Sequence, residues 1–172
     1  MTIDTRSTVK EVREHFSERM REGESTMCPC CNRVVKLYKR SITSAMAYGL
    51  ILFVRKYRDT RLGYFNTRWK SPWFHMEGVL SDLGAPISIR GDMGKWIHWD
   101  CLERSEDFRE DGNPDTGLYR LTSSAVGFVF NKRELRKYVK IYNKVTYGFD
   151  GPMISIVEAL QNKFNYSELM SP

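Results

Sequence analysis

Hydrophobic residues recur at helical spacing in two long parts of this chain. Val12, Phe16 and Met20 are each four residues apart, which predicts an amphipathic helix over Val9–Arg21. A more uniformly apolar run, Ala45–Tyr57, predicts a second helix that is buried on most sides. We expect this second helix to form the centre of the core.

The second half of the chain mixes helical and strand patterns. Alternation predicts a strand over Leu118–Leu121, and two further alternating runs, Lys137–Tyr142 and Val145–Phe149, flank Asn143 and Lys144. A two-residue connection of this kind predicts a β-hairpin. Helical spacing predicts the remaining helices over Met76–Leu83, Asp92–Arg104, Ser123–Asn131 and Ile154–Phe164.

The order of these elements predicts an α+β fold. A long helix, a short helix, a turn, another helix and a strand are typical of a winged helix-turn-helix, here followed by a C-terminal β-hairpin. The predicted parts are an N-terminal helix over residues 1–26, a zinc-knuckle and winged-helix-like domain with the hairpin over 27–151, and a C-terminal helix over 152–172. No apolar run reaches the roughly 18 residues that a membrane span needs.

Three of the four cysteines lie close together, at positions 28, 30 and 31. Cys28 and Cys31 have the spacing of a zinc knuckle, which predicts a structural Zn²⁺. Cys30 is able to replace one of them as a ligand. A redox role and ordinary buried thiols are the alternatives, although the chain after the cluster lacks the helix start of a thioredoxin-like site.

His98 and Cys101 are the candidates for the other two zinc ligands. On the predicted helix they are three residues apart and therefore share a face. The alternative is a small core cysteine beside a histidine whose ring bonds to the backbone. In that case His15, His75 or a second subunit would complete the site.

Charge is distributed in blocks along the chain. The net charge is +6, but residues 33–70 carry +9 and residues 119–149 carry +6, while residues 71–118 between them carry −6. Such blocks predict a surface for a polyanion such as nucleic acid, with solvated faces as the alternative. The predicted nucleic-acid contacts are Arg33, Lys36, Lys39, Arg40, Lys95, Arg120, Lys132, Arg133, Arg136, Lys137, Lys140 and Lys144.

Tyrosines are interleaved with these cations. Tyr38, Tyr138 and Tyr142 lie where they would stack on bases, or where they would be half-buried residues of a sheet. No complete catalytic motif is present, so we expect no enzyme activity. The acidic cluster of Glu106, Asp107, Glu110 and Asp111 fits a solvated loop better than a magnesium site.

Two resemblances follow from these motifs. The segment from Gly117 to Val129, with Thr122 as helix cap and Gly127 behind it, resembles the junction between wing and helix in winged-helix repressors of the MarR type. More widely, the order of the C-P-x-C cluster, the apolar helix, His98-Trp99 and the Lys137–Asn143 run resembles uncharacterised small proteins of phages and prophages. This second resemblance implies a zinc-bearing winged-helix fold of viral origin.

The sequence therefore predicts a non-catalytic nucleic-acid-binding protein of phage origin that acts on duplex DNA as a transcriptional regulator or a DNA-protecting factor. We expect it in the cytoplasm of the host cell, with a homodimer as one possible state. The alternative function is a protein-interaction module that docks on a host enzyme or defence protein. Its docking surface would be the −6 segment with Trp69, Trp73, Trp96 and Trp99.

Overall fold

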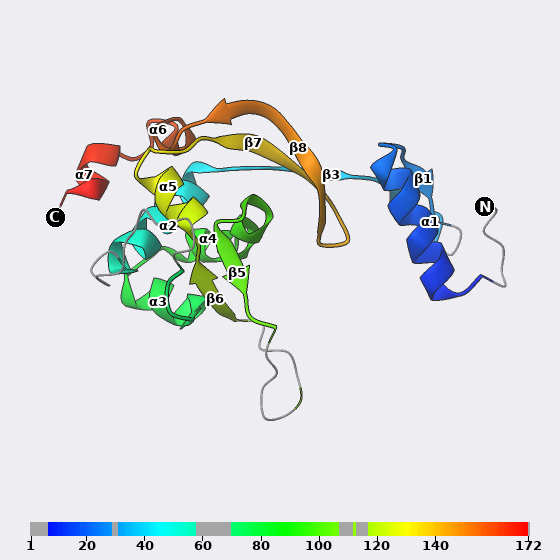
Figure 1. Cartoon of the computed structure of the whole chain (residues 1–172), viewed down its shortest axis with the longest axis horizontal. Helices are drawn as coiled ribbons and strands as arrows, with labels where there is room; N and C mark the ends of the chain where they lie inside the picture. Colours follow the sequence, from blue (N-terminus) through cyan, green and yellow to red (C-terminus); the bar gives the residue numbers. More distant parts are fainter. Residues whose placement is uncertain (1–6, 29–30, 58–69, 107–111, 113–116, 172) are drawn as a thin grey trace. The chain divides into compact units, whose positions relative to one another are not determined.

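The computed structural model describes residues 7–28, 31–57, 70–106, 112 and 117–171. In these residues the protein has an α+β fold with seven α-helices and three small antiparallel sheets. The chain divides into two compact units (Figure 1). Unit 1 comprises Met1–Ser41 and Tyr138–Gly151, and unit 2 comprises Ile42–Lys137 and Pro152–Pro172. None of the described helices is long and apolar enough to cross a membrane.

Unit 1 begins with helix α1, Val9–Arg21, which has the predicted bounds. Thr8 and Glu11 form a capping box that satisfies backbone N–H groups at its first turn, and Phe16 and Met20 are the buried residues of its apolar face. A short hairpin follows, in which β1, Thr26–Met27, pairs with β2, Val34–Val35.

A three-stranded antiparallel sheet carries β3, Tyr38–Ser41, beside β7, Leu135–Tyr142, and β8, Val145–Ile154 (Figure 1). The predicted hairpin is confirmed, and Asn143 and Lys144 form its two-residue connection. Their φ angles of 46° and 66° are those of a turn that matches the right-handed twist of the strands. The strand order is β3, β7, β8, so β3 lies at one edge of this sheet.

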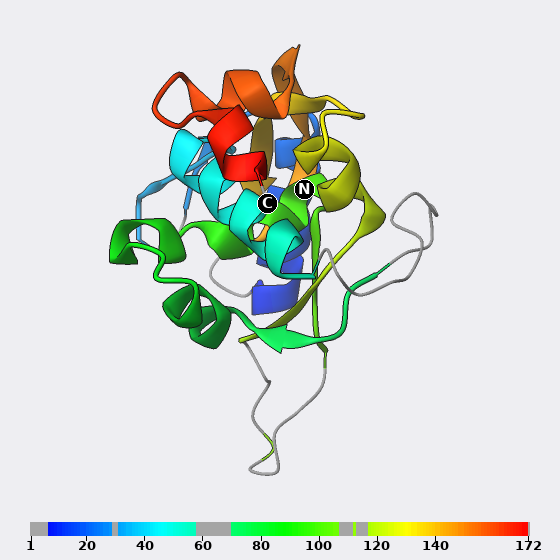
Figure 2. The same cartoon turned by 90° about the vertical axis from the view of Figure 1, so that its left-hand side faces the viewer.

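The centre of unit 2 is helix α2, Ser44–Tyr57, as its apolar pattern predicts. Thr43 caps it by accepting a hydrogen bond of 3.2 Å from the Met46 N–H. Helices α5, Ser123–Val129, α6, Ile156–Leu160, and α7, Tyr166–Met170, pack against α2 (Figure 2). Burial of α2 between several elements accounts for its nearly continuous apolar sequence.

A second three-stranded sheet lies beside these helices, in the order β4, β6, β5. The strands are β4, Phe74–His75, β6, Leu118–Leu121, and β5, Leu102–Arg104. Between β4 and β5 the chain forms α3, Met76–Asp82, α4, Ile87–Arg90, and a 3₁₀ helix η1, Met93–Trp99.

The predicted helix over Asp92–Arg104 is wrong in its second half. Helical structure ends at Trp99, because Asp100 adopts a left-handed conformation with φ of 57°. The residues that follow form β5, in which Leu102 pairs with Leu121 and Glu103 with Arg120. Pairing with a strand distant in sequence outweighs the local helical pattern, as sequence spacing alone cannot show.

The predicted helix over Ile154–Phe164 is also too long. It is confined to α6, because Gln161 and Asn162 have φ angles of 54° and 57° and so end the helix. Helix α7 then begins at a new cap, where the Asn165 side chain accepts from the backbone N–H groups of Ser167 and Glu168.

Candidate functional site

The cysteine cluster lies in the loop of the β1–β2 hairpin. The Cys28 N–H donates to the Arg33 carbonyl over 2.8 Å, and the Asn32 N–H donates to the Cys28 carbonyl, also over 2.8 Å. Asn32 has a φ of 55°, a conformation that a short polar side chain tolerates. The loop is therefore a tight turn that begins at Cys28 and includes Cys31, whereas Pro29 and Cys30 lie outside the described residues.

Two of the predicted zinc ligands, Cys28 and Cys31, lie in this turn. Cys28 is half-buried, Cys31 is exposed, and neither is in a disulfide. A hairpin loop with two cysteines at this spacing is the arrangement of zinc ribbons. In the part of the chain that the structure describes, no three His, Cys, Asp or Glu side chains gather around one point.

The tip of the β7–β8 hairpin lies near the same turn. Burial, then the neighbouring Tyr147 and Cys28, raise the pKa of the Tyr142 hydroxyl, while Arg13 of α1 acts in the opposite direction. The rings of Tyr142 and Tyr147 meet edge to face, with centroids 6.3 Å apart. Unit 1 therefore gathers helix α1, the cysteine turn and the hairpin tip around Tyr142.

His98 and Cys101 belong to unit 2, whereas Cys28 and Cys31 belong to unit 1. His98 lies on η1, and burial lowers its pKa. Cys101 is fully buried, its thiol lies 3.7 Å from the Trp99 carbonyl, and burial strongly raises the pKa of the thiol. The turn at Asp100 separates the two residues, so they do not share a helix face.

Several predicted cations of unit 2 bond to partners within the protein. Lys95 pairs with Asp92, and the Arg120 guanidinium lies 2.6 Å from Glu103. Arg133 donates to the Ser124 hydroxyl over 2.7 Å. Lys132 is exposed and forms no ion pair with a described residue. Little positive charge on η1 and β6 is therefore left for an external anion.

The backbones of Arg136 and Lys137 are also used within unit 2. The Arg136 carbonyl accepts from the Trp99 indole N–H over 2.7 Å, and the Lys137 carbonyl accepts from the Ile42 N–H over 2.9 Å. These bonds fix the start of β7.

The β3–β7 register divides the basic residues of unit 1 between two faces of the sheet. Lys39 is opposite Lys140, so these two share one face. On that face the Lys39 ammonium lies 2.8 Å from Oδ2 of Asp150 and 4.1 Å from the centre of the Tyr138 ring. Lys39 therefore forms an ion pair with Asp150 and a cation–π contact with the Tyr138 ring.

The opposite face of β3 carries a different set of contacts. Tyr38 is 51% exposed, and the Arg40 guanidinium carbon lies 6.0 Å from the centre of its ring. Lys36, two residues before Tyr38, is exposed as well. We call Lys36, Tyr38 and Arg40 the basic strip. Within the described residues neither cation of the strip forms an ion pair, and the same holds for Arg33 before it and Lys144 at the hairpin tip.

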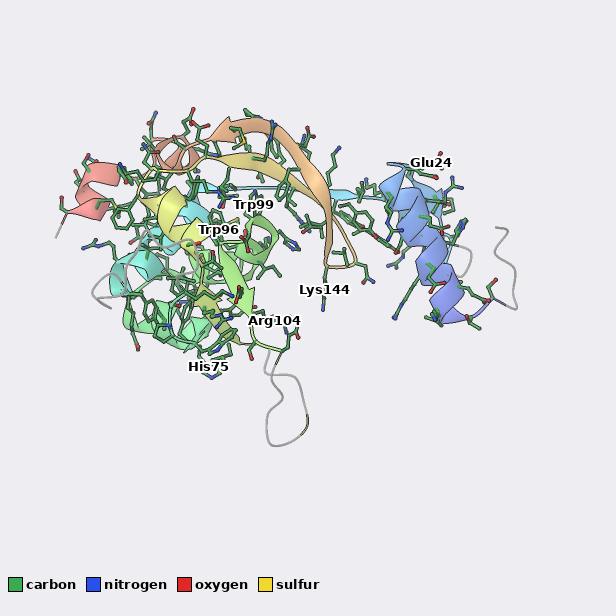
Figure 3. All side chains as sticks on the ribbon, viewed as in Figure 1. Glu24, His75, Trp96, Trp99, Arg104 and Lys144 are labelled. Carbon is green, nitrogen blue, oxygen red and sulfur yellow. The ribbon has the colours of Figure 1, made fainter. Side chains whose placement is uncertain are left out.

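The tryptophans of the alternative docking surface do not form one exposed group. Trp96 and Trp99 both belong to η1 (Figure 3). Trp96 is fully buried and Trp99 is 3% exposed. The Trp96 indole N–H donates to the Met46 carbonyl over 3.1 Å, so this side chain belongs to the core. Trp73 is 39% exposed, whereas Trp69 and the acidic residues Asp107, Glu110 and Asp111 lie outside the described residues.

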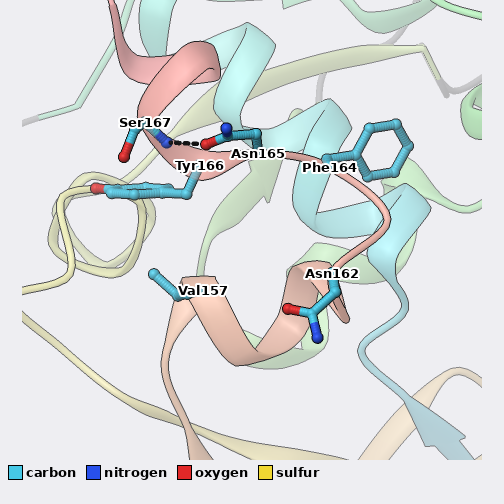
Figure 4. A pocket seen from close by; sticks show the side chains of 6 residues that line it. All are labelled: Val157, Asn162, Phe164, Asn165, Tyr166 and Ser167. Carbon is cyan, nitrogen blue, oxygen red and sulfur yellow. Dashed lines mark hydrogen bonds between the residues drawn. The ribbon is translucent and has the colours of Figure 1, made fainter.

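A cavity of about 420 Å³ lies between α6 and α7 (Figure 4). Two of its polar side chains form hydrogen bonds within the protein. The Asn165 side chain accepts from the Ser167 N–H over 3.0 Å, and the Tyr166 hydroxyl donates to the Val129 carbonyl over 2.8 Å. The cavity is lined by Val157, Asn162, Phe164, Asn165, Tyr166 and Ser167, none of which is charged.

We compared the chain with protein-family models, with curated proteins and with solved structures, and found no significant match. The resemblances to MarR-type repressors and to small phage proteins therefore remain predictions from the sequence.

Proposed function

We propose that this protein binds nucleic acid, specifically duplex DNA, without catalysis, and that the basic strip of unit 1 is its principal contact. One observation carries the proposal: Lys36 and Arg40 flank an exposed tyrosine and form no ion pair with a described carboxylate. Cations that are not neutralised within the protein release counterions from DNA when they meet its phosphates.

The order of elements in unit 2 supports a winged-helix arrangement as part of this proposal. Helix α2, strand β4 and helix α3 are followed by α4 and η1, and then by β5 and β6, with β6 central in the sheet. In a winged helix the second helix of the turn motif enters the major groove. In this protein α4 and η1 would take that place, and their cations pair with carboxylates. Lys95 pairs with Asp92, and Arg90 pairs with Glu77. We therefore assign the main electrostatic contact to unit 1.

A structural Zn²⁺ is the cofactor that we propose for the cysteine turn. Cys28 and Cys31 would hold it as thiolates, and the metal would supply cross-linking rather than reactivity. Since the turn leads through β2 directly into Lys36 and the basic strip, the metal would hold the start of the strip in place. A regulator or DNA-protecting factor of a phage, acting in the cytoplasm of its host, is the biological setting that we propose.

A mobility-shift titration with duplex DNA at several salt concentrations tests the proposal. The double variant Lys36→Gln/Arg40→Gln should weaken binding and lower the slope of log affinity against log salt by about 2, since each lost phosphate contact removes about 0.9. Lys39→Gln is the matched control, because Lys39 lies between them in sequence but pairs with Asp150 on the other face. No binding at low salt, or equal losses in variant and control, would contradict the proposal.

A protein partner in the host is the second candidate. The cysteine hairpin favours it, because Met27 and Val34 face each other across β1 and β2 and are 49% and 52% exposed. Exposed apolar pairs of this kind are common at protein interfaces. Capture from host lysate with and without nuclease distinguishes the two functions, since a nucleic-acid-mediated association is lost on nuclease treatment.

A further inference from the structure

Three tyrosines are candidates for base stacking, and the structure distinguishes Tyr38 from the other two. Tyr38 is 51% exposed, whereas Tyr138 and Tyr142 are half-buried. The Lys39 ammonium lies 4.1 Å from the centre of the Tyr138 ring. The rings of Tyr142 and Tyr147 meet edge to face. Among these three tyrosines, Tyr38 is therefore the one whose ring is open to an external group.

Tyr38 projects from the chain in line with two cations. Exposure alternates between Val34 and Tyr38, as it does along an extended chain with one outward side. Lys36 is exposed, whereas Leu37 is half-buried. Alternation along β3 then places Arg40 on the same side as Tyr38, and its guanidinium carbon lies 6.0 Å from the centre of the ring. The ring thus lies between Lys36 and Arg40 at one edge of the sheet.

Both cations are available to phosphates. Neither Lys36 nor Arg40 forms an ion pair in the part of the chain that the structure describes. The neighbouring strand β7 pairs Ile141 with Tyr38 and Val139 with Arg40, and these two apolar residues carry no charge. At these pairs, therefore, β7 places no carboxylate beside the strip that would repel a nucleic-acid backbone.

The spacing of the strip fits one base beside the ring. Side chains on one side of a strand are roughly 7 Å apart, which is twice the ~3.4 Å that separates stacked bases in DNA. A base that stacks on Tyr38 therefore fits between the ring and the Lys36 side chain, on the side away from Arg40. The base pairs of a duplex already cover the faces of their bases, so an exposed ring gains this contact only from an unpaired base.

We infer that the DNA bound at the basic strip is unpaired there, with one base stacked on Tyr38 and the flanking phosphates at Lys36 and Arg40. Stacking on an aromatic ring needs a free face of a base but no particular base. This inference rests on the proposed function and adds that the strip contacts a single-stranded segment, such as an overhang next to a duplex. Tyr38, which carries no charge, is then the residue that distinguishes unpaired from paired DNA.

Fluorescence anisotropy of the full chain with three labelled DNAs tests this inference. The probes are a blunt duplex, the same duplex with a six-nucleotide overhang, and the single strand alone. We expect the overhang to bind more tightly than the blunt duplex. Tyr38→Ala should weaken binding of the overhang roughly 5- to 150-fold, the range for one lost base stack, and leave the blunt duplex nearly unchanged. The single strand should show the same dependence on Tyr38.

The salt dependence and two further variants separate stacking from charge and from general loss of apolar surface. Because Tyr38→Ala removes no cation, its salt slope should equal that of the wild type, unlike the slope of Lys36→Gln/Arg40→Gln. Tyr38→Phe keeps the ring and should retain most of the preference for the overhang. Val34→Ala is the matched control, since Val34 is 52% exposed on the same outward side but has no ring.

The outcomes distinguish this inference from the proposed function. The inference is overturned if the overhang and the blunt duplex bind equally well, if Tyr38→Ala weakens both alike, or if Tyr38→Phe loses as much as Tyr38→Ala. DNA still binds in each of these cases, so the proposed function is retained. No binding of any of the three DNAs at low salt contradicts both. Far-ultraviolet circular dichroism checks the folding of each variant, and Tyr38→Leu replaces the alanine variant if that variant does not fold.

Discussion

The Lys39 ammonium lies 2.8 Å from Oδ2 of Asp150, a residue that follows it by 111 positions in the chain. This contact neutralises Lys39, whereas Arg40, its neighbour in β3, forms no ion pair with a described residue. The sequence alone does not show this difference between the two cations. The hydrogen bond from Lys39, followed by that from the Gly151 N–H, lowers the pKa of Asp150, so the carboxylate is charged at neutral pH. Asp150 therefore neutralises Lys39 on one face of the sheet, whereas Arg40 on the other face forms no ion pair with a described residue.

Removal of this carboxylate should strengthen binding of a polyanion. Asp150→Asn removes a negative charge that repels phosphate from unit 1, so we expect DNA affinity at low salt to rise a few-fold, while the salt slope, which counts the phosphate contacts of the strip, stays nearly the same. Mobility shift at two or more salt concentrations measures both. Glu158→Gln, which removes a capping carboxylate of α6 in unit 2, is the control and should leave affinity unchanged.

Lys137 and Lys140 should not contribute equally. Lys140 is opposite Lys39, whereas Lys137 is an odd number of residues away along β7 and so projects from the same side as the strip. We expect Lys137→Gln to weaken DNA binding more than Lys140→Gln does. A larger effect of Lys140→Gln would place the nucleic acid on the face that carries Tyr138.

Gly151 should tolerate no side chain. A Cβ atom there would lie 2.4 Å from Cδ2 of Tyr138, and its φ of 76° disfavours any other residue. Gly151→Ala should lower the free energy of unfolding by about 2–3 kcal/mol. Gly23→Ala is the matched control, since Gly23 has a φ of 79° but open space around it. Urea denaturation should show a smaller loss, about 1 kcal/mol, for the control.

Acid should weaken the network around Glu103. Burial acts to raise the pKa of this carboxyl, but hydrogen bonds and charges from Lys70 and Arg120 outweigh it, so the pKa is lowered. A lowered pKa means that the stabilisation is complete above the unfolded value of about 4.3 and is lost as the pH falls through the folded value.

Glu103→Gln should therefore cost about 1 kcal/mol of unfolding free energy at pH 7 and less than that at pH 3. Urea denaturation at both pH values measures this difference. Glu77→Gln removes an ion pair with Arg90 in which the glutamate side chain is 74% exposed, and it should change stability by less than about 0.5 kcal/mol. A cost for Glu103→Gln that persists in acid would argue against this role of its charge.

Metal content should depend on the cysteine turn. We expect about one zinc per chain in the purified protein if Cys28 and Cys31 bind it within one chain, and near zero in Cys28→Ser. Cys101→Ala should keep the metal and lose about 1–2 kcal/mol of stability, because it leaves a small cavity in the core. Elemental analysis decides the matter, and loss of zinc in Cys101→Ala would assign Cys101 to the metal site.

Local patterns in the sequence were sufficient for the elements that depend on neighbouring residues. Helix α1, the long helix α2 and the two-residue hairpin at Asn143 and Lys144 follow from spacing, caps and turn residues. The predictions were wrong where the conformation depends on a partner far away in the sequence. Leu102–Arg104 is a strand because it pairs with β6. The positive φ angles of Asp100 and Gln161, which end helices, also have no clear local signal.

The amino-acid sequence shows which side chains are available: a basic block after the cysteine cluster, a second one near the hairpin, and thiols at metal-binding spacing. Which of those charges are neutralised depends on the tertiary structure. Ion pairs join Asp150 to Lys39, Glu103 to Arg120 and Asp92 to Lys95. Lys36 and Arg40, in contrast, form no ion pair with any described residue. The reason is physical: a charge is a property of one residue, but its neutralisation depends on a partner that the fold brings within a few ångströms.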